Sequence, residues 1–158
     1  MMKTLITPPQ VLSLAFGEGT ALPPQSLTQA DIASAEHRYL RPLLGEALHE
    51  RLLAGEEPAF VADYLAAPLA IFTRVSVQPK LDIQAGACGT TAPKSSWYQP
   101  ADHASRREAL GALRREGRSL LRRACDYLEA NADRFPDYDP TKNPLKRCAI
   151  HGNLVQTP

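Results

Sequence analysis

The segment 86–97, "GACGTTAPKSSW", carries two glycines, a Lys-Ser pair and small hydroxyl residues, which are the materials of a phosphate-binding loop. Such a loop needs glycine directly before Lys-Ser, so that backbone N–H groups can surround the phosphates. Here Pro93 precedes Lys94, and proline has no N–H and a fixed φ. Pro100 also interrupts the helix that would have to follow the loop. The sequence therefore argues against a nucleotide site.

Cysteine and histidine residues offer two further kinds of chemistry. Cys148 and His151 form C-x-x-H, which is half of a zinc site, but no second pair with suitable spacing supplies the other two ligands. A Cys–His nucleophile pair needs only proximity in space, and its candidate is Cys88 with His103 or His151 as the base. Cys125 follows a helical apolar pattern and is interpreted as a core thiol. We expect no bound metal, nucleotide or organic cofactor.

Charged residues gather in the stretch that contains Glu36, His37, Glu46, His49 and Glu50. Glu36 and His37 are adjacent, so they point to different faces of a helix. Glu46 and His49 are three positions apart and can meet. The interpretation we favour is a solvated helix face rather than a catalytic site.

The predicted helix 101–131 holds seven arginines, and its acidic residues are Glu108, Glu116, Asp126 and Glu129, with Asp102 near its start. The first interpretation is a solvated helix with internal ion pairs. The second is a basic face that packs on an acidic protein partner, with Arg114 and Arg118 as its central residues. Nucleic acid comes third, because aromatic stacking groups are missing from this helix.

The composition places the chain among ordinary single-domain proteins. Its 158 residues carry 18 Lys and Arg against 17 Asp and Glu, so a net charge of +1 gives no overall field for nucleic acid or acidic lipid. The longest apolar run, Tyr64–Phe72, contains Pro68 and is far shorter than the ~20 residues of a membrane helix. Three widely spaced cysteines favour reduced thiols. We expect a cytoplasmic protein without a membrane partner.

The apolar periodicity predicts an all-α fold, a small bundle of about four helices. The first begins at Thr7-Pro8, and the second is capped by Ser26 or Thr28 and is kinked or split at Pro42. The third is an apolar central helix that starts near Pro58 and is kinked or restarted at Pro68. The second should run to Gly55, the third should close at Pro79, and the fourth spans about 101–131.

The remaining residues are expected to lack helices. The stretch 80–100 reads as a long loop with room for a short strand at 80–84, and the tail reads as a small hairpin with His151-Gly152-Asn153 at its turn. We assign residues 1–135 to a helical domain and 136–158 to a C-terminal extension. The predicted core consists of the following residues: Leu65, Leu69 and Phe72 against Tyr39, Leu113, Leu120 and Leu121.

Three stretches of the first half, "LITPPQVLSLAF", "DIASAEHRYLRPLLGEALHERLLAG" and "YLAAPLAIFTRVSVQPKL", carry a pattern of their own. A short T-x-x-x-V/L helix precedes a helix with I-x-x-A-E-x-x-I/Y and an L-G end, and a third apolar helix follows. Over residues 4–82 the chain resembles the head–tail connector (adaptor) proteins of tailed phages and prophages. It also resembles an uncharacterised family of small prophage-type helical proteins in which a "TAPKSSW"-like segment recurs.

The resemblance implies a structural subunit that joins a ring between portal and tail, with neither catalysis nor a cofactor. Its partners would be further copies of itself and portal or tail-completion proteins, with no nucleic acid except passing DNA. It would be found in the host cytoplasm and in the virion. The alternative is a small helical enzyme or ligand-binding domain, which predicts a closed pocket with converging polar groups.

The opening segment has a different interpretation if the resemblance holds. Its small residues let the backbone adapt to a neighbouring subunit, and Lys94, Trp97 and Tyr98 become candidate interface residues. The competing interpretation is a compact loop folded over its own core.

Overall fold

The computed structural model describes residues 3–17, 22, 26–86, 89–91, 101–146, 149–151 and 154–156. Within these residues the chain is an all-α bundle of about five helical rods, which confirms the predicted fold class. The rods are α1 (Pro8–Val11) with η1 (Leu12–Phe16), α2 (Gln29–Ala35) with η3 (Glu36–Leu40) and α3 (Arg41–Leu44), α4 (Glu46–Ala54), α5 (Pro58–Phe60) with η4 (Val61–Leu65) and α6 (Ala66–Asp82), and α7 (His103–Ala130).

Short elements complete the described chain. They are the strands β1 (Gln84–Gly86), β2 (Gly89–Thr91), β3 (Ala149–His151) and β4 (Leu154–Gln156), and the 3₁₀ turns η5 (Pro140–Lys142) and η6 (Pro144–Lys146). The strands form two antiparallel hairpins, β1–β2 and β3–β4. In the second hairpin His151 is paired with Leu154, so the predicted C-terminal hairpin is confirmed.

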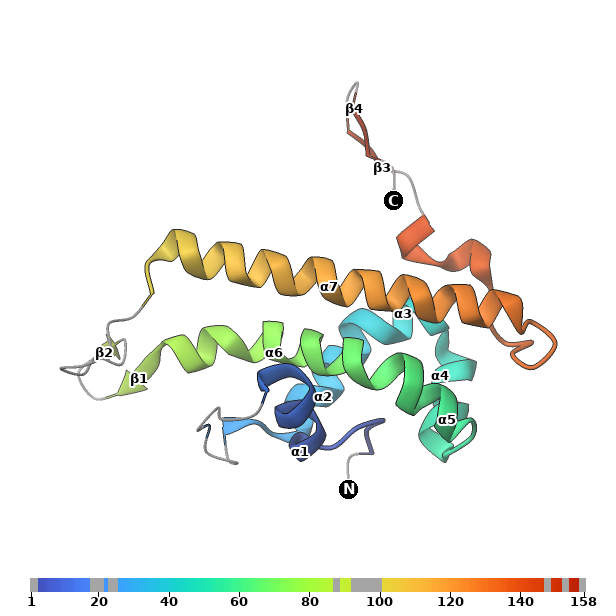
Figure 1. The fold of residues 1–158 in the computed structure, drawn as a ribbon, viewed down its shortest axis with the longest axis horizontal. Helices are drawn as coiled ribbons and strands as arrows, with labels where there is room; N and C mark the ends of the chain where they lie inside the picture. Colours follow the sequence, from blue (N-terminus) through green and yellow to red (C-terminus); the bar gives the residue numbers. More distant parts are fainter. Residues whose placement is uncertain are drawn as a thin grey trace.

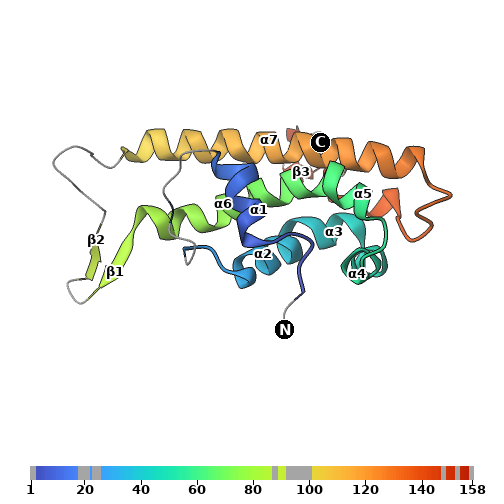
Figure 2. The same cartoon turned by 60° about the horizontal axis from the view of Figure 1, so that its bottom comes forward.

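Helix α6 is the centre of the bundle. It runs antiparallel to α7 along the long axis of the molecule, and α1 and α2 lie on its other side (Figures 1 and 2). Most of its residues between Ala66 and Val77 are buried, as expected for the most apolar segment of the sequence.

Side-chain caps explain where the helices begin. The Thr7 N–H donates to Oε1 of Gln10 at 2.8 Å, and the Thr28 N–H donates to Oδ2 of Asp31 at 3.0 Å. Both are capping boxes, and Thr7 and Thr28 were predicted as helix starts. At α7, the Asp102 carboxylate accepts from the backbone N–H of Ser105.

Prolines inside two rods coincide with π-helical turns. Pro42 follows η3 and Pro68 follows η4 closely, and each proline lacks the N–H that an α-helix would use. The chain widens the turn ahead of the proline, so that the Ala66 N–H reaches the carbonyl of Val61, five residues back. The predicted kinks therefore take the form of π turns.

The second predicted helix is divided by Gly45. This glycine has φ 81° and ψ 161°, a conformation that favours glycine and turns the chain between α3 and α4. A kink or split of this helix was predicted at Pro42, and the break lies three residues later, at the Leu44-Gly45 pair that the resemblance marks as a helix end. This break gives about five rods instead of about four.

The prediction that Pro79 closes the third helix was wrong. Helix α6 continues to Asp82, where the Gln78 amide donates to the Asp82 carboxylate at 2.9 Å and bridges the last turn. Proline removes a single hydrogen bond, and this side-chain bond lies across the same turn. The strand that was expected at 80–84 therefore begins only at Gln84, and part of the predicted 80–100 loop is helix and hairpin.

The core is close to its prediction. The fully buried predicted members are Leu65, Leu69, Phe72 and Leu121. The Tyr39 ring stacks on the Phe72 ring with centroids 4.2 Å apart. Leu113 and Leu120 are only half-buried, because at 100° per residue they lie at the edge of the stripe that α7 buries through Leu121, Ala124 and Leu128.

The segment after α7 packs on the bundle instead of leaving it. Tyr138 and Asn143 are 8% and 1% exposed, and Tyr138 belongs to the same core as Phe135. The boundary placed after residue 135 therefore falls inside a packed region.

Helices α6 and α7 approach each other closely at Gly117. A Cβ added there would lie 2.8 Å from Cε2 and Cζ of Phe72 and 3.3 Å from Cγ2 of Ile71. Phe72 cannot retreat easily, because Tyr39 stacks on it. By contrast, a Cβ at Gly111 would meet only a guanidinium nitrogen of Arg115, at 3.5 Å.

We expect Gly117→Ala to lower the free energy of unfolding by about 1–2 kcal/mol, because overpacking costs more than the helix propensity of alanine returns. Gly111→Ala on the same helix should raise it by about 0.5–1 kcal/mol. Urea denaturation of both variants measures the two effects. Equal shifts in the same direction would contradict the close approach at Gly117.

Candidate functional site

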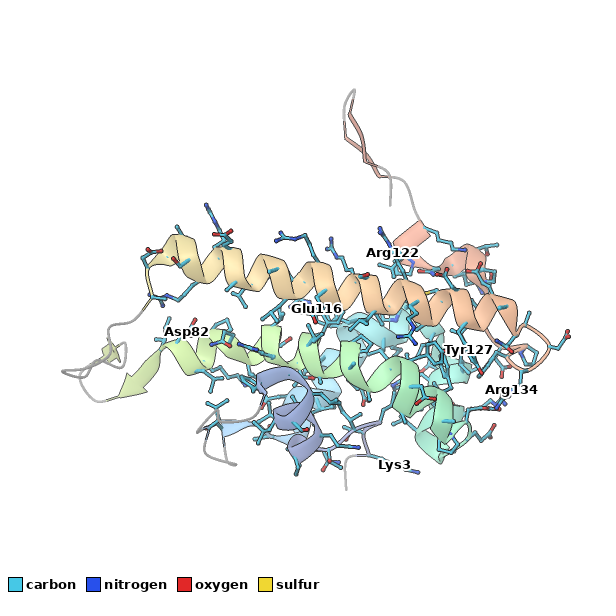
Figure 3. The ribbon with its side chains drawn as sticks, viewed as in Figure 1. Lys3, Asp82, Glu116, Arg122, Tyr127 and Arg134 are labelled. Atoms are coloured by element: carbon cyan, nitrogen blue, oxygen red, sulfur yellow. The ribbon has the colours of Figure 1, made fainter. Side chains whose placement is uncertain are left out.

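The outward side of α7 carries most of its charge. The helix buries Gly117, Leu121, Ala124 and Leu128 toward the bundle, whereas Arg114 and Arg118 lie one turn apart and are exposed. Figure 3 shows the side chain of Arg122 projecting from the edge of α7 that faces away from α6.

Five exposed arginines share this side. At 100° per residue their positions fall within about 100° of the helix circumference. We call them the arginine face, and they are Arg107, Arg114, Arg115, Arg118 and Arg122. Two other arginines of α7 are engaged within the chain. The Arg106 Nε donates to the carbonyl of Ala101 at 2.7 Å, and the Arg123 guanidinium lies 5.1 Å from the centroid of the Tyr64 ring.

Most other cations of the described chain have carboxylate partners; Lys3, Arg38 and Arg74 do not, and Arg74 donates to the Ala15 carbonyl instead. The ion pairs are Arg41–Glu46, Arg51–Glu56, Arg51–Asp137, Lys80–Asp31, Arg134–Glu57, Lys142–Asp139 and Lys146–Glu129. Among the described residues, no ion pair includes an arginine of α7. The arginine face therefore stands out because it gathers several cations without an ionic partner on one helix, whereas the other such cations in the described chain lie singly on separate segments.

The prediction of internal ion pairs along α7 was wrong. Neither Glu108 nor Glu116 has an arginine three or four positions away, so neither meets one on the helix surface. Asp126 follows Arg122 by four residues, which is the less favourable order for such a pair. The spacing of the acids explains why the arginines stay free.

The prediction of a solvated face near Glu36 and His49 was also wrong. Glu36 is 3% exposed and His49 is 8% exposed, and Oε2 of Glu36 lies 3.4 Å from Nε2 of His49. This distance is within ion-pair range, but the geometry does not make a hydrogen bond. The other carboxylate oxygen accepts the Leu5 N–H at 2.6 Å. Glu36 thus ties the N-terminal segment and α4 to η3.

The other members of that charged stretch stay at the surface. His37 and Arg41 approach within 3.2 Å, and Glu46 pairs with Arg41 instead of meeting His49. Glu50 is exposed on α4, and no partner of its carboxylate lies among the described residues.

Cys125 is a core thiol, as predicted. It is 2% exposed, and it accepts a hydrogen bond from Nδ2 of Asn143 at 3.1 Å. Burial raises the pKa of this thiol, and burial together with the neighbouring Cys125 raises the pKa of Tyr138. A protonated, buried thiol is neither a nucleophile nor a metal ligand. Cys125, Tyr138 and Asn143 therefore form a hydrogen-bonded cluster with a structural role.

Several predicted site residues lie outside the described part of the chain. They are Cys88, Lys94, Trp97, Tyr98 and Cys148. Their candidate roles as thiol, ligand or interface residues stay predictions. Within the described residues, no group of three or more His, Cys, Asp or Glu side chains is placed to hold a metal ion.

A hollow of about 250 Å³ lies between the α3–α4 corner and η5. Its charged lining residues are Glu46, Asp137, Asp139 and Lys142. Each of them already has an ion-pair partner within the chain. The hollow therefore lacks polar groups that converge on a ligand, which a binding pocket needs.

One helical stretch is long and apolar enough to cross a membrane by length and composition. It spans Pro58–Asp82, 25 residues, with a mean hydropathy of 1.4 in its most apolar window. In the bundle 61% of that window is buried, as is usual for a central helix that other helices surround. The stretch is weak evidence for a membrane span.

The fold and the surface can now be set beside known proteins. No curated protein and no solved structure matches the chain significantly. A family model matches residues 25–147, which covers α2 to η6 and includes the arginine face. Because this match spans most of the sequence, the chain belongs to the DUF6712 family, a family of unknown function.

Proposed function

We propose that the protein is a structural assembly subunit of a tailed phage or prophage, a head–tail connector or adaptor that joins a ring between portal and tail. The observation that carries the proposal is the arginine face of α7, which is exposed and has no ionic partner among the described residues. The resemblance of residues 4–82 to connector proteins supports it. The proposal requires no catalysis and no cofactor.

The arginine face, which has no ionic partner among the described residues, has the chemistry needed to bind another protein. Arginine is enriched in protein interfaces, because its planar guanidinium binds carboxylates through two parallel hydrogen bonds. Free arginines on a rigid helix can do so without first breaking a bond inside their own chain. A solvated surface gains nothing from concentrating its unpaired cations on one helix.

Arg114→Glu combined with Arg118→Glu should weaken assembly by at least about tenfold, because repulsion replaces attraction at the centre of the arginine face. The monomer should keep its fold, since both side chains are exposed and free of contacts within the described chain. Light scattering in the presence of the portal protein encoded by the same genome measures assembly, and circular dichroism measures the fold.

Lys3→Glu is the control, because Lys3 is exposed on the side of the molecule opposite α7 (Figure 3). Assembly of the double variant at the wild-type level would count against the arginine face. DNA binding that disappears with the same substitutions would indicate a nucleic-acid surface instead. Portal and capsid genes beside the gene for this protein would support the assembly role independently.

A further inference from the structure

The net charge of +1 conceals two oppositely charged regions. Helix α7 holds seven arginines against four carboxylates, a net charge of +3. The stretch from Glu46 to Asp63, which spans α4, α5 and half of η4, holds five carboxylates against one arginine, a net charge of −4. Opposite charges are therefore segregated rather than mixed over the surface.

Internal ion pairs neutralise only part of the acidic stretch. Glu46, Glu56 and Glu57 pair with arginines of their own chain. Glu50 and Asp63 are exposed, and neither has an ionic partner among the described residues. We call these two residues the acidic end, because α4 and α5 lie at the same end of the molecule (Figures 1 and 2).

The two charged surfaces occupy different parts of one subunit: Arg114 and Arg118 lie near the middle of α7, Glu50 lies on α4, and Asp63 lies on η4, whose Tyr64 stacks on Tyr127 near the end of α7. In Figure 2, α7 runs along one edge of the molecule and α4 lies across the bundle from it. A subunit with two complementary surfaces in different places can bind a second copy head to tail. Such a contact repeats from copy to copy, and it closes into a ring when the rotation between copies permits.

We propose that the arginine face of one copy binds the acidic end of the next copy, so that Arg114 and Arg118 meet Glu50 and Asp63 across the interface. This inference rests on the proposed function, because it names the partner of the same arginine face. A second copy supplies the carboxylates that the described chain does not place beside these arginines.

The surroundings of the arginine face favour carboxylates on a protein over a nucleic-acid backbone. Glu108 and Asp126 both lie at the edge of the arginine arc, where they would repel phosphates. No aromatic residue lies among the five arginines to stack on bases. A partner with a few separated carboxylates fits this pattern better than a continuous polyanion.

A charge-swap experiment on the full chain tests the contact. One protein carries Arg114→Glu and Arg118→Glu, and the other carries Glu50→Lys and Asp63→Lys. Each protein presents two surfaces of the same sign, so each should associate with itself at least about tenfold more weakly than wild type. An equimolar mixture pairs opposite signs at every contact and should associate again, as should the chain that carries all four substitutions.

Sedimentation velocity at low and high salt measures association, and circular dichroism confirms that each protein is folded. Lys3→Glu and Glu116→Lys are matched controls, because Lys3 lies far from α7 and Glu116 lies on the flank of α7 away from the arginine face. Both control proteins should associate like wild type. Association should weaken as salt rises.

Four results would overturn the inference. A mixture that stays monomeric shows that the two surfaces do not meet, and so does an acidic-end variant that associates like wild type. A wild-type chain that is monomeric alone but still binds the portal overturns this contact and leaves the proposed function standing. A chain that associates with neither overturns both.

Discussion

Leu69→Ala is expected to lower the free energy of unfolding by about 2–5 kcal/mol. Leu69 is 0% exposed on the central helix α6, so the truncated side chain leaves a cavity among residues that several rods hold in place. Helix α6 packs against α7 on one side and against α1 and α2 on the other, which limits how far the core can collapse into that cavity (Figure 1).

Denaturation in urea, followed by circular dichroism, measures this loss. Leu14→Ala is the matched control, because Leu14 is 47% exposed and its truncation should change stability by less than about 0.5 kcal/mol. A loss of that small size at Leu69 would show that α6 is not the centre of the core.

Glu36→Ala is expected to cost about 3 kcal/mol, the upper end of the range for leaving a buried hydrogen-bonding group without its partner. The substitution leaves the Leu5 N–H without its acceptor and His49 without its neighbour. The Leu5 N–H is partly buried and His49 is buried. Water therefore cannot fully replace the hydrogen-bond acceptor that the carboxylate provides.

Two further variants separate the contributions at this site. Glu36→Gln keeps an oxygen that can accept from Leu5 and should cost clearly less than Glu36→Ala. Glu50→Ala removes an exposed carboxylate and should leave monomer stability within about 0.5 kcal/mol of wild type. Equal losses for the alanine and glutamine variants would mean that the bond to Leu5 contributes nothing.

The helical bundle could be predicted from the sequence, because residues close together in the chain determine where each helix begins and which of its faces is buried. Thr7 and Thr28 cap helices within three residues, and the apolar spacing around Leu69 and Phe72 defines a buried face without reference to the rest of the chain. The prolines marked the positions where the rods deviate, although not the form that the deviation takes.

The features that could not be predicted from the sequence depend on the direction of the chain at a turn and on contacts between residues that are far apart in the sequence. The φ of 81° at Gly45 turns α4 back, and that turn brings His49 to Glu36 and buries both. Residue spacing alone suggested Glu46 as the neighbour of His49, but Glu46 pairs with Arg41 of α3 and His49 lies beside Glu36 of η3. For the arginine face, the positions of Glu108 and Glu116 were a usable signal, since neither lies at pairing distance from an arginine.

The contact between Gly117 and Phe72 has a mechanical consequence. The Phe72 ring contacts both the backbone of α7 at Gly117 and the Tyr39 ring, so there is no free space between α6 and α7 at this point. Tyr39 belongs to η3, the same turn that carries Glu36. A load applied to α7 and directed toward α6 would therefore press on Phe72 and pass through Tyr39 to the turn that anchors the N-terminal segment, rather than being absorbed where it is applied.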